Sequence, residues 1–463
     1  MLSIARYALV SFFLYILYFH GLDAVGLLGP DEPRYAWIGR AMARTGDWIT
    51  PRLWGEPWFE KPVLLYWMTG LGFRAGLADE LAPRLPVALL SVGFLVAYGL
   101  LLKEQVGGQA AALATSILAT SAGWLAYSHV AVTDVPLSAT FTLAMLAACQ
   151  WLRNGNPRRL WISGALLGAA VLAKGLVPLV LALPLVWLGR GHWRVCWRLA
   201  AGVVAVAAPW YLLCYAQNGT PFLTDFIWKH HVARFFTRSL EHVQPFWFYF
   251  PVLLGGLFPW TPLLGLLRWP GPDPVLRLLW IWPAFGLVFF SASMNKLPGY
   301  VLPLLPPVCA LLGVSLARRR HGPAWLAACA LLMATLPVIA ALLPQALETG
   351  IRRSVLEPPP MWIWVAALGL CAAVWMAETK PWRELSMALL LAAVCAGVWL
   401  IGSITFPRLD QTVSARSRWI GAHAVAEQVC LDDPHRARRY GLNYYSGAVL
   451  PDCETNPRPV RLR

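Results

Sequence analysis

The chain is short of charge. Asp, Glu, Lys and Arg make up 13% of its 463 residues, whereas a soluble domain carries about 25%. Hydrophobic residues reach 58%, and the mean hydropathy is +0.56. The polar residues are too few to cover the surface of a globule of this size. Lipid must therefore contact most of the surface. The composition excludes an ordinary soluble domain and predicts an all-α polytopic membrane protein.

Other signals are missing as well. The nine cysteines fall singly, with no CxxC and no Cys/His spacing typical of a metal site. No internal repeat or low-complexity linker interrupts the chain. The net charge of +15 is carried by short basic clusters between apolar spans, which is typical of membrane topology signals. We therefore expect no nucleic-acid partner.

Apolar segments long enough to cross a bilayer need about 17–25 residues. The sequence offers thirteen candidates, roughly 5–22, 81–102, 108–127, 132–152, 160–173, 175–189, 195–215, 246–266, 276–293, 298–316, 323–344, 360–377 and 385–406. The pair around Lys174–Gly175 is the least regular, and Lys174 is interpreted as a turn residue. Residues 63–73 are apolar but too short to span, so we expect them at the interface.

Charge placement gives an orientation. With the N-terminus inside, the inner loops are short and basic, as the positive-inside rule requires. Their bases are Lys103, Arg153, Arg158, Arg159, Arg190, Arg194, Arg198, Arg268, Arg277, Arg318, Arg319, Arg320, Lys380 and Arg383. The first outer loop, 23–80, is mixed, with eight acids and six bases. The start of the chain lacks a small-x-small cleavage site and is interpreted as a retained span.

The expected layout is a membrane domain over 1–406 and a small outer tail over 407–463. Within the membrane domain, the polar loops 23–80 and 216–245 lie outside. In the tail we expect a helix over Arg418–Cys430 and possible strands over Arg439–Tyr445. Cys430 and Cys453 lie in an oxidising compartment, where they are either disulfide-bonded or free. The location predicted is the bacterial inner (plasma) membrane, with the N-terminus cytoplasmic and the tail periplasmic.

Six polar places fall on the outer face under this topology. They are Asp31/Glu32 with Arg34, Glu60/Lys61, Asp134, the run Lys229–Arg234, His242, and the run Lys296–Tyr300. A lipid-embedded protein does not keep such groups without a reason. Arg, Lys and Tyr suit a phosphate, and a nearby carboxylate suits the deprotonation of a hydroxyl. If a lipid phosphate is the leaving group, no separate general acid is needed.

Several segments carry a family resemblance: DEPRYA, EKPVLLYW, TDVPL, KHHVARF, HVQPFWFY and KLPGYVLP. They resemble the bacterial GT-C glycosyltransferases related to protein O-mannosyltransferases, and most of all the aminoarabinose transferases that modify lipid A. The resemblance covers roughly residues 5–310. It implies about thirteen transmembrane helices, with two juxtamembrane helices in the first outer loop. It also implies inverting transfer of a sugar from an undecaprenyl-phosphate carrier.

The resemblance assigns roles to single residues. Asp31 becomes the catalytic carboxylate and Asp134 a second acid at the site. The resemblance assigns the binding of the carrier phosphate to Lys61, Arg234 and Tyr300. A metal has been considered near positions that match Glu60 and His231, but we assign no cofactor. The remaining substrate-binding candidates are Arg34, His242 and Lys296.

Structural alternatives stand beside these roles. Asp31 and Asp134 could each cap the helix that follows, Glu32 is interpreted as structural, and Lys61 could pair with Glu60 or snorkel. The tail is shorter than the soluble domain of aminoarabinose transferases, which leaves the sugar and the acceptor open. The acceptor could be a lipid A-type glycolipid or a protein Ser/Thr. A polyprenyl-lipid transporter is the rival of another class, disfavoured because the ionisable groups gather at one face.

Overall fold

The computed structural model describes residues 2–188, 193–226, 228, 243–318, 323–349, 353–355, 358, 360–380, 383–432 and 435–462. These residues are overwhelmingly helical, because a backbone in lipid must satisfy its N–H and C=O groups within its own segment. Eight of the described helices are long and apolar enough to cross a membrane, or nine if one bent pair counts as a span. The prediction of an all-α polytopic membrane protein is confirmed, and the exact count of thirteen spans stays a prediction.

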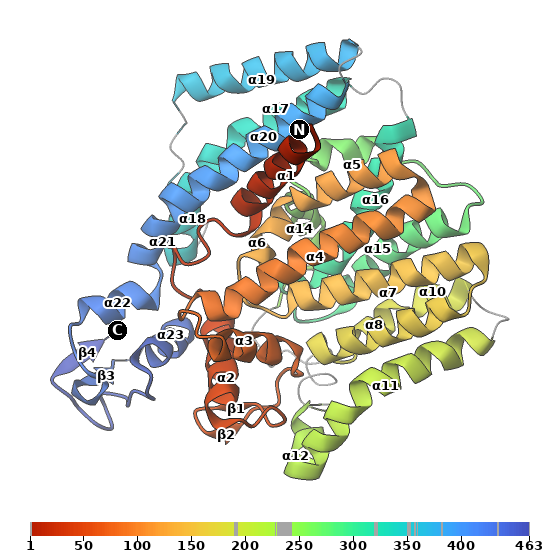
Figure 1. Ribbon diagram of the computed structural model, residues 1–463. Coiled ribbons are helices and arrows are strands. Elements are labelled where there is room, and N and C mark those ends of the chain that lie inside the picture. Colours follow the sequence, from red (N-terminus) through yellow and green to blue (C-terminus); the bar gives the residue numbers. More distant parts are fainter. Residues whose placement is uncertain are drawn as a thin grey trace.

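The first half of the chain supplies one end of the bundle and its centre (Figure 1). Its elements are α1 (Leu2–Tyr18), α2 (Asp31–Thr45), β1 (Arg52–Leu53), β2 (Glu56–Pro57), α3 (Leu64–Arg74), α4 (Leu81–Val106), α5 (Gly108–Ala119), α6 (Ala122–Ser128), α7 (Asp134–Asn154), α8 (Arg158–Lys174), α9 (Val177–Leu181), α10 (Leu183–Leu188), α11 (Trp193–Asn218) and α12 (Thr220–Leu223). The predicted span 108–127 is the bent pair α5 and α6, which turn by 59°.

The second half completes the bundle. Its elements are η2 (Phe246–Phe248), α14 (Tyr249–Gly256), η3 (Thr261–Leu266), α15 (Pro274–Ala292), η4 (Pro298–Leu304), α16 (Leu305–Arg318), α17 (Pro323–Leu332), η5 (Met333–Thr335), α18 (Leu336–Thr349), α19 (Met361–Thr379), α20 (Arg383–Leu400), η7 (Ile401–Thr405) and α21 (Phe406–Thr412). The predicted span 246–266 is broken into the short pieces η2, α14 and η3.

Helix α7 is the centre of the packing. It contacts α4, α8, α15 and η4, and most of its residues are buried. On α8, Gly164 lets α11 approach closely, since a Cβ built on Gly202 would lie 2.8 Å from the Gly164 backbone. Close contact of this kind is how helices associate in lipid. The ends of α2, α7 and α8 are thereby fixed relative to one another.

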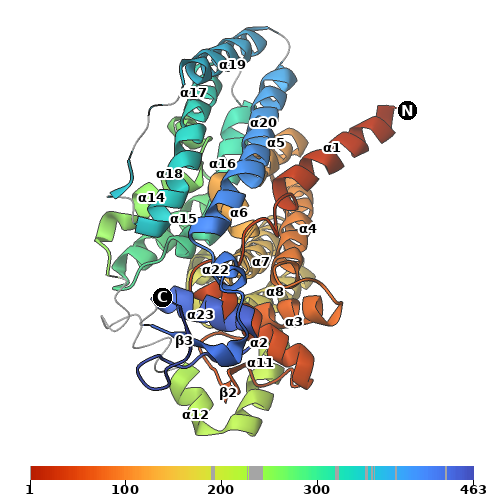
Figure 2. The ribbon, with the colours of Figure 1, turned by 90° about the vertical axis from the view of Figure 1, so that its left-hand side faces the viewer.

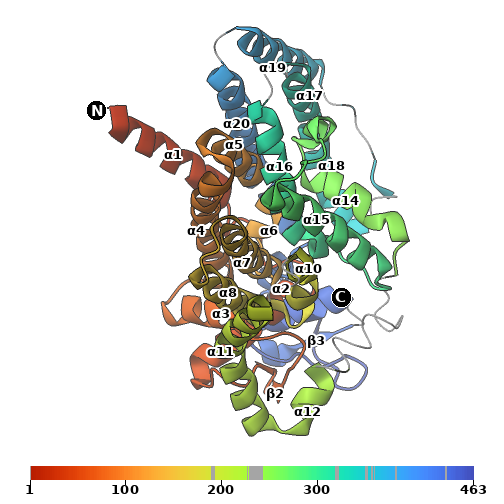
Figure 3. The same cartoon turned by 90° about the vertical axis from the view of Figure 1, so that its right-hand side faces the viewer.

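The first loop forms two helices beside the bundle. Helix α2 ends where Gly46, with φ +76°, donates to Met42 O, a left-handed helix end. The apolar stretch interpreted as interfacial forms α3, which packs on α2 and α4. Views from the two sides place α2 and the β1–β2 hairpin away from α19, at the opposite end of the molecule (Figures 2 and 3).

The C-terminal segment contains α22 (Ala415–Gly421), η8 (Ala426–Gln428), β3 (Val429–Leu431), α23 (Arg436–Ser446) and β4 (Val460–Leu462). Strands β3 and β4 pair in parallel. Both predictions for this tail were wrong in detail. The expected helix stops at Gly421, and the expected strand lies in α23.

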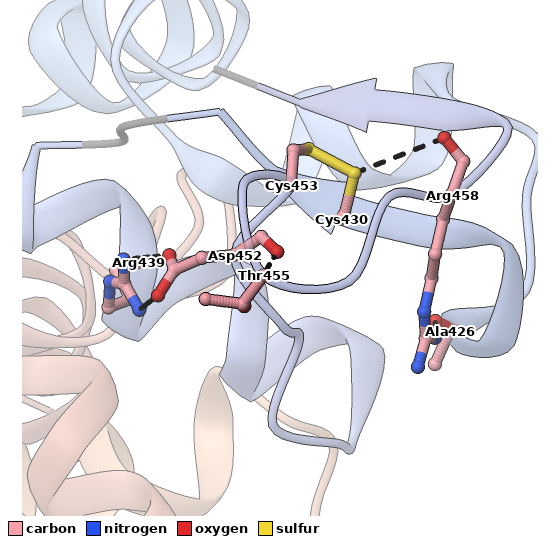
Figure 4. The surroundings of a disulfide bond; sticks show 7 residues. All are labelled: Ala426, Cys430, Arg439, Asp452, Cys453, Thr455 and Arg458. Atoms are coloured by element: carbon pink, nitrogen blue, oxygen red, sulfur yellow. Dashed lines mark hydrogen bonds and ion pairs between the residues drawn. A yellow bond between two sulfur atoms is a disulfide. The ribbon is translucent and has the colours of Figure 1, made fainter.

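The run at α23 misled because its tyrosines suggest a strand, whereas arginine is a good helix former. The His435 side chain also caps α23, accepting from the Ala437 N–H at 3.3 Å. Cys430 and Cys453 form a disulfide, which resolves the alternative left open by the sequence (Figure 4). Helix α23 lies between the two cysteines in the chain, so the disulfide closes the loop that carries it.

Candidate functional site

Asp31 and Arg34 open helix α2 on one face. The Arg34 Nη2 lies 2.5 Å from Asp31 Oδ1 and 3.0 Å from Glu60 Oε2. Arg34 is 1% exposed, whereas the Asp31 side chain is 42% exposed. One buried cation therefore holds two carboxylates, and one of them still faces the outside.

The guanidinium of Arg34 sits among aromatic rings. Its Cζ lies 5.3 Å from the Tyr35 ring, 5.5 Å from the Trp58 ring and 5.4 Å from the Tyr440 ring. Burial disfavours the charge, but Glu60, Tyr35 and Asp31 outweigh it and raise the pKa of Arg34 above its usual value. The cation is therefore permanent at any working pH, and its field on Asp31 is fixed.

The capping alternative for Asp31 is not what the structure shows. Pro30 precedes the helix without a side-chain cap, and the Asp31 carboxylate engages Arg34 instead. The neighbouring acid behaves differently. Glu32 pairs with Arg84 at 2.7 Å, with both side chains 1% exposed, and it accepts from the backbone N–H groups of Leu28 and Ala131. The structural interpretation of Glu32 is confirmed.

Glu60 and Lys61 lie in the stretch between β2 and α3. The Lys61 Nζ lies 3.3 Å from Glu60 Oε1, and both side chains are nearly buried. Glu60 thus bridges Arg34 and Lys61. The ion-pair alternative for Lys61 is observed, and its role with a phosphate stays a prediction.

Asp134 begins helix α7 and receives an ion pair from Lys174, the last residue of α8. The Lys174 Nζ lies 2.6 Å from Asp134 Oδ1, and both side chains are nearly buried. The same ammonium lies 4.9 Å from the centroid of the Tyr300 ring, a cation–π distance. Thr133 precedes Asp134 with no side-chain cap. Asp134 itself lies in the first turn of α7, where the helix dipole stabilises a negative charge, so the structural alternative stands beside the site role.

The sequence interpretation of Lys174 as a turn residue missed this pair. The signal was present, since a lone lysine ended an apolar helix where no lysine is needed. Gly299, next to Tyr300, shows how close the elements are: a Cβ built there would lie 2.4 Å from Asp134 Oδ1. Only glycine fits between η4 and the start of α7.

Tyr127, near the end of α6, connects the two carboxylate centres. A Cβ on Gly299 would lie 2.8 Å from the Tyr127 ring, and the Tyr127 phenol is within electrostatic range of Asp134, Asp31 and Tyr300. The structure therefore brings Asp31, Arg34, Glu60, Asp134 and Tyr300 into one region. They come from segments up to about 270 positions apart in the chain.

An apolar cavity starts at Tyr127. It has a volume of about 250 Å³ and is lined by α6, α14, η4 and α16, with the residues Ala122, Gly123, Tyr127, Val252, Leu253, Gly255, Gly256, Pro298, Val301, Leu302 and Leu305. Gly255 has no neighbouring atom near its Cβ position. The carboxylate region thus borders a space suited to a hydrocarbon chain.

The remaining candidates from the sequence are either buried in a turn or lie outside the described residues. Lys296 is 5% exposed, and its ammonium donates to Ser293 O at 2.5 Å and to Gln244 O at 3.0 Å, so it stabilises the turn between α15 and η4. His231, Arg234 and His242 lie outside the described residues. Within the described ranges no group of three His, Cys, Asp or Glu is arranged to hold a metal ion.

Comparison with known proteins gives the family. The model for dolichyl-phosphate-mannose-protein mannosyltransferases matches residues 3–250. The undecaprenyl phosphate-alpha-4-amino-4-deoxy-L-arabinose arabinosyl transferase of Pseudomonas paraeruginosa is 34% identical over 66% of this chain, which spans 58% of that relative's length. The Erwinia tasmaniensis enzyme of the same name is 30% identical over 95% of this chain and 88% of its own.

The fold has a solved counterpart. The crystal structure of ArnT from Cupriavidus metallidurans in the apo state matches with a TM-score of 0.75 and 25% identity, over 99% of this chain and 93% of that one. The same protein bound to undecaprenyl phosphate gives a TM-score of 0.77 at 24% identity. The chain therefore belongs to the dolichyl-phosphate-mannose-protein mannosyltransferase family of GT-C membrane glycosyltransferases, together with the bacterial aminoarabinose transferases.

Proposed function

We propose that the protein transfers a sugar of the 4-amino-4-deoxy-L-arabinose type from undecaprenyl phosphate to a lipid A-type acceptor. The observation that carries the proposal is the exposed carboxylate of Asp31, held by the buried Arg34, in the region shared with Asp134 and Tyr300. The membrane family and the names of the relatives support a polyprenyl-phosphate donor.

Asp31 is the proposed catalytic carboxylate. It deprotonates an acceptor hydroxyl, or orients an acceptor phosphate, for attack on the anomeric carbon. The new bond joins the acceptor oxygen to that carbon, and the bond to the carrier phosphate breaks with inversion. The carrier phosphate leaves as a stable anion, so no general acid is required.

The carrier enters from the lipid. Its first isoprene units occupy the apolar cavity that begins at Tyr127, and its phosphate is bound by Lys61, Arg234 and Tyr300. The Asp134–Lys174 pair lies beside Tyr300 and is proposed to bind the sugar. The carboxylate and the ammonium are matched to an amine and a hydroxyl of the donor.

The proposed orientation follows from the short basic loops on one side of the membrane and the polar loops on the other. We place the protein in the bacterial inner membrane, with the N-terminus cytoplasmic and the site periplasmic. The membrane domain then covers 1–406, with active-site loops over 23–80 and 216–245, and 407–463 is the periplasmic tail.

The test is a transfer assay with purified protein in nanodiscs. Undecaprenyl phosphate-aminoarabinose is offered together with lipid A, and the products are identified by mass spectrometry. We expect aminoarabinose-modified lipid A and free undecaprenyl phosphate. A Ser/Thr-rich peptide offered in place of lipid A separates the protein acceptor from the glycolipid. Carrier crossing the bilayer without product would support the transporter and overturn the proposal.

A further inference from the structure

The C-terminal segment contributes a side chain to the site. Tyr440 of α23 places its ring centroid 5.4 Å from Arg34 Cζ. The same ring stacks on Trp54 of the first loop, with centroids 5.3 Å apart. Figure 1 shows α23 beside α2, and these helices are in contact. A residue more than 400 positions away in the chain thus covers the cation that holds Asp31.

The position of Tyr440 is fixed independently of Arg34. On the same helix, Tyr444 O accepts from Arg40 Nη1 at 3.1 Å, and Tyr444 donates its hydroxyl to Asp79 O at 2.8 Å. The Tyr445 hydroxyl is 3.0 Å from Glu80 Oε1. Helix α23 is therefore docked on the first loop by polar contacts, and this docking fixes the position of Tyr440 next to Arg34.

Arg436 lies one turn earlier on α23, at the same ring. Its Cζ is 5.6 Å from the Tyr440 centroid, and its side chain is exposed. In the described part of the chain Arg436 has no carboxylate partner, whereas its neighbour Arg439 pairs with Asp452. A cation–π contact holds the guanidinium in place and leaves its donor fork open for an anion.

We propose that Arg436 binds a phosphate group of the acceptor, and that Tyr440 is a positioning residue for Arg34. This inference rests on the proposed function only in taking the bound molecule to be the acceptor. The cations beside Asp31 and Glu60, which are Arg34 and Lys61, are already engaged in ion pairs with them. A guanidinium at the edge of the site, with no carboxylate partner among the described residues, adds an attraction for an anionic acceptor and orients it before transfer.

Kinetics with two acceptors test the assignment. The probes are bis-phosphorylated lipid A and an enzymatically prepared mono-phosphorylated form, which keeps one phosphate available for transfer, each titrated against wild type, Arg436→Gln and the matched control Arg461→Gln. Arg461 is an exposed arginine of β4 in the same segment. We expect Arg436→Gln to raise the KM for the bis-phosphorylated acceptor about tenfold, as one charge-assisted contact suggests. The donor KM should not change, and the KM for the mono-phosphorylated acceptor should change less than that for the bis-phosphorylated one.

A second pair of variants tests the positioning role. Tyr440→Ala should lower kcat, because Arg34 loses the ring that fixes it, and Tyr440→Phe should restore wild-type kcat, because the ring and not the hydroxyl makes the contact. Equal kcat for Tyr440→Ala and wild type would overturn this part, as would failure of Tyr440→Phe to restore it in folded protein.

A direct binding measurement tests the inference independently of the proposed function. Affinity for bis-phosphorylated lipid A is measured by thermophoresis in detergent, without donor. Weaker binding by Arg436→Gln than by Arg461→Gln supports the anion site even if wild type transfers no sugar to lipid A. Equal affinities of wild type and Arg436→Gln overturn it, whatever the transfer assay shows.

Discussion

Asp31 and Glu32 are adjacent acids with opposite surroundings. The Glu32 carboxylate is 1% exposed and pairs with the equally buried Arg84. The Asp31 carboxylate is 42% exposed and shares its cation, Arg34, with Glu60. Both acids begin the same helix, and each has an arginine within 3 Å. The pairs differ in whether the acid is enclosed.

The Glu32–Arg84 pair is closed on all sides. Arg84 donates to Glu32 and to the carbonyls of Leu22, Val25 and Gly26, and Glu32 accepts two backbone N–H groups besides. A buried ion pair with every donor and acceptor satisfied fixes geometry. In the Asp31–Arg34 pair the carboxylate is partly exposed, as a group that acts on a substrate must be. Adjacent acids can therefore divide structure and chemistry between them.

Removal of the closed pair should have the largest effect. Glu32→Ala leaves the Arg84 charge buried without its partner, which costs about 3–5 kcal/mol. We expect loss of folded protein or a much lower thermal midpoint in detergent, followed by size-exclusion chromatography. The exposed Glu56→Ala, from the same loop, is the matched control. A wild-type midpoint for Glu32→Ala would contradict the structural assignment.

Removal of the cation that pairs with Asp134, the second candidate acid, should destabilise the protein less. Lys174→Ala removes the partner of Asp134 and its contact with the Tyr300 ring, so we expect kcat/KM to fall about 10- to 100-fold, as loss of a charge-assisted contact implies. The thermal midpoint should change less than for Glu32→Ala. Lys103→Ala, an exposed lysine at the far end of α4, should be neutral. Full activity of Lys174→Ala would remove this pair from the site.

The disulfide should affect activity least. The double variant Cys430→Ser/Cys453→Ser opens the loop that carries α23 and destabilises that segment by about 3 kcal/mol, the chain-entropy value for a short loop. Tyr440 then holds Arg34 less firmly, and we expect activity to fall only a few-fold. Proteolysis confined to the tail is the measurement, with the exposed free Cys196→Ser as control. Unchanged protease resistance would show that polar docking alone fixes α23.

Local sequence signals predicted much of the fold. Apolar length identified the helices α4, α7 and α15 within a few residues, because lipid imposes that length directly. The broken region 246–266 and the helix at α23 were missed, because proline-rich and tyrosine-rich runs are ambiguous without their packing partners. Asp31 could be singled out as part of the polar cluster in the first outer loop and Asp134 as a lone acid at the start of an apolar span, whereas their roles were assigned from the family resemblance.

The partners of those acids could not be read from the sequence alone. Asp134 and Lys174 are 40 positions apart, and their meeting depends on how α7 packs on α8. The stacking of Tyr440 over Arg34 depends on docking of the C-terminal segment. Motifs therefore identified the candidate residues, whereas tertiary packing decided which cation pairs with which carboxylate.

The most direct measurement is the transfer rate of Asp31→Asn per folded molecule. Asparagine keeps the shape of the side chain but cannot accept a proton, so we predict a loss of about a thousandfold, within the range of general-base catalysis. The thermal midpoint should stay near that of wild type, because the buried Arg34 keeps Glu60 as a charged partner. Asp23→Asn, an exposed acid before α2, should keep full activity. A wild-type rate for Asp31→Asn, with folding intact, would contradict the assignment of Asp31 as the catalytic carboxylate.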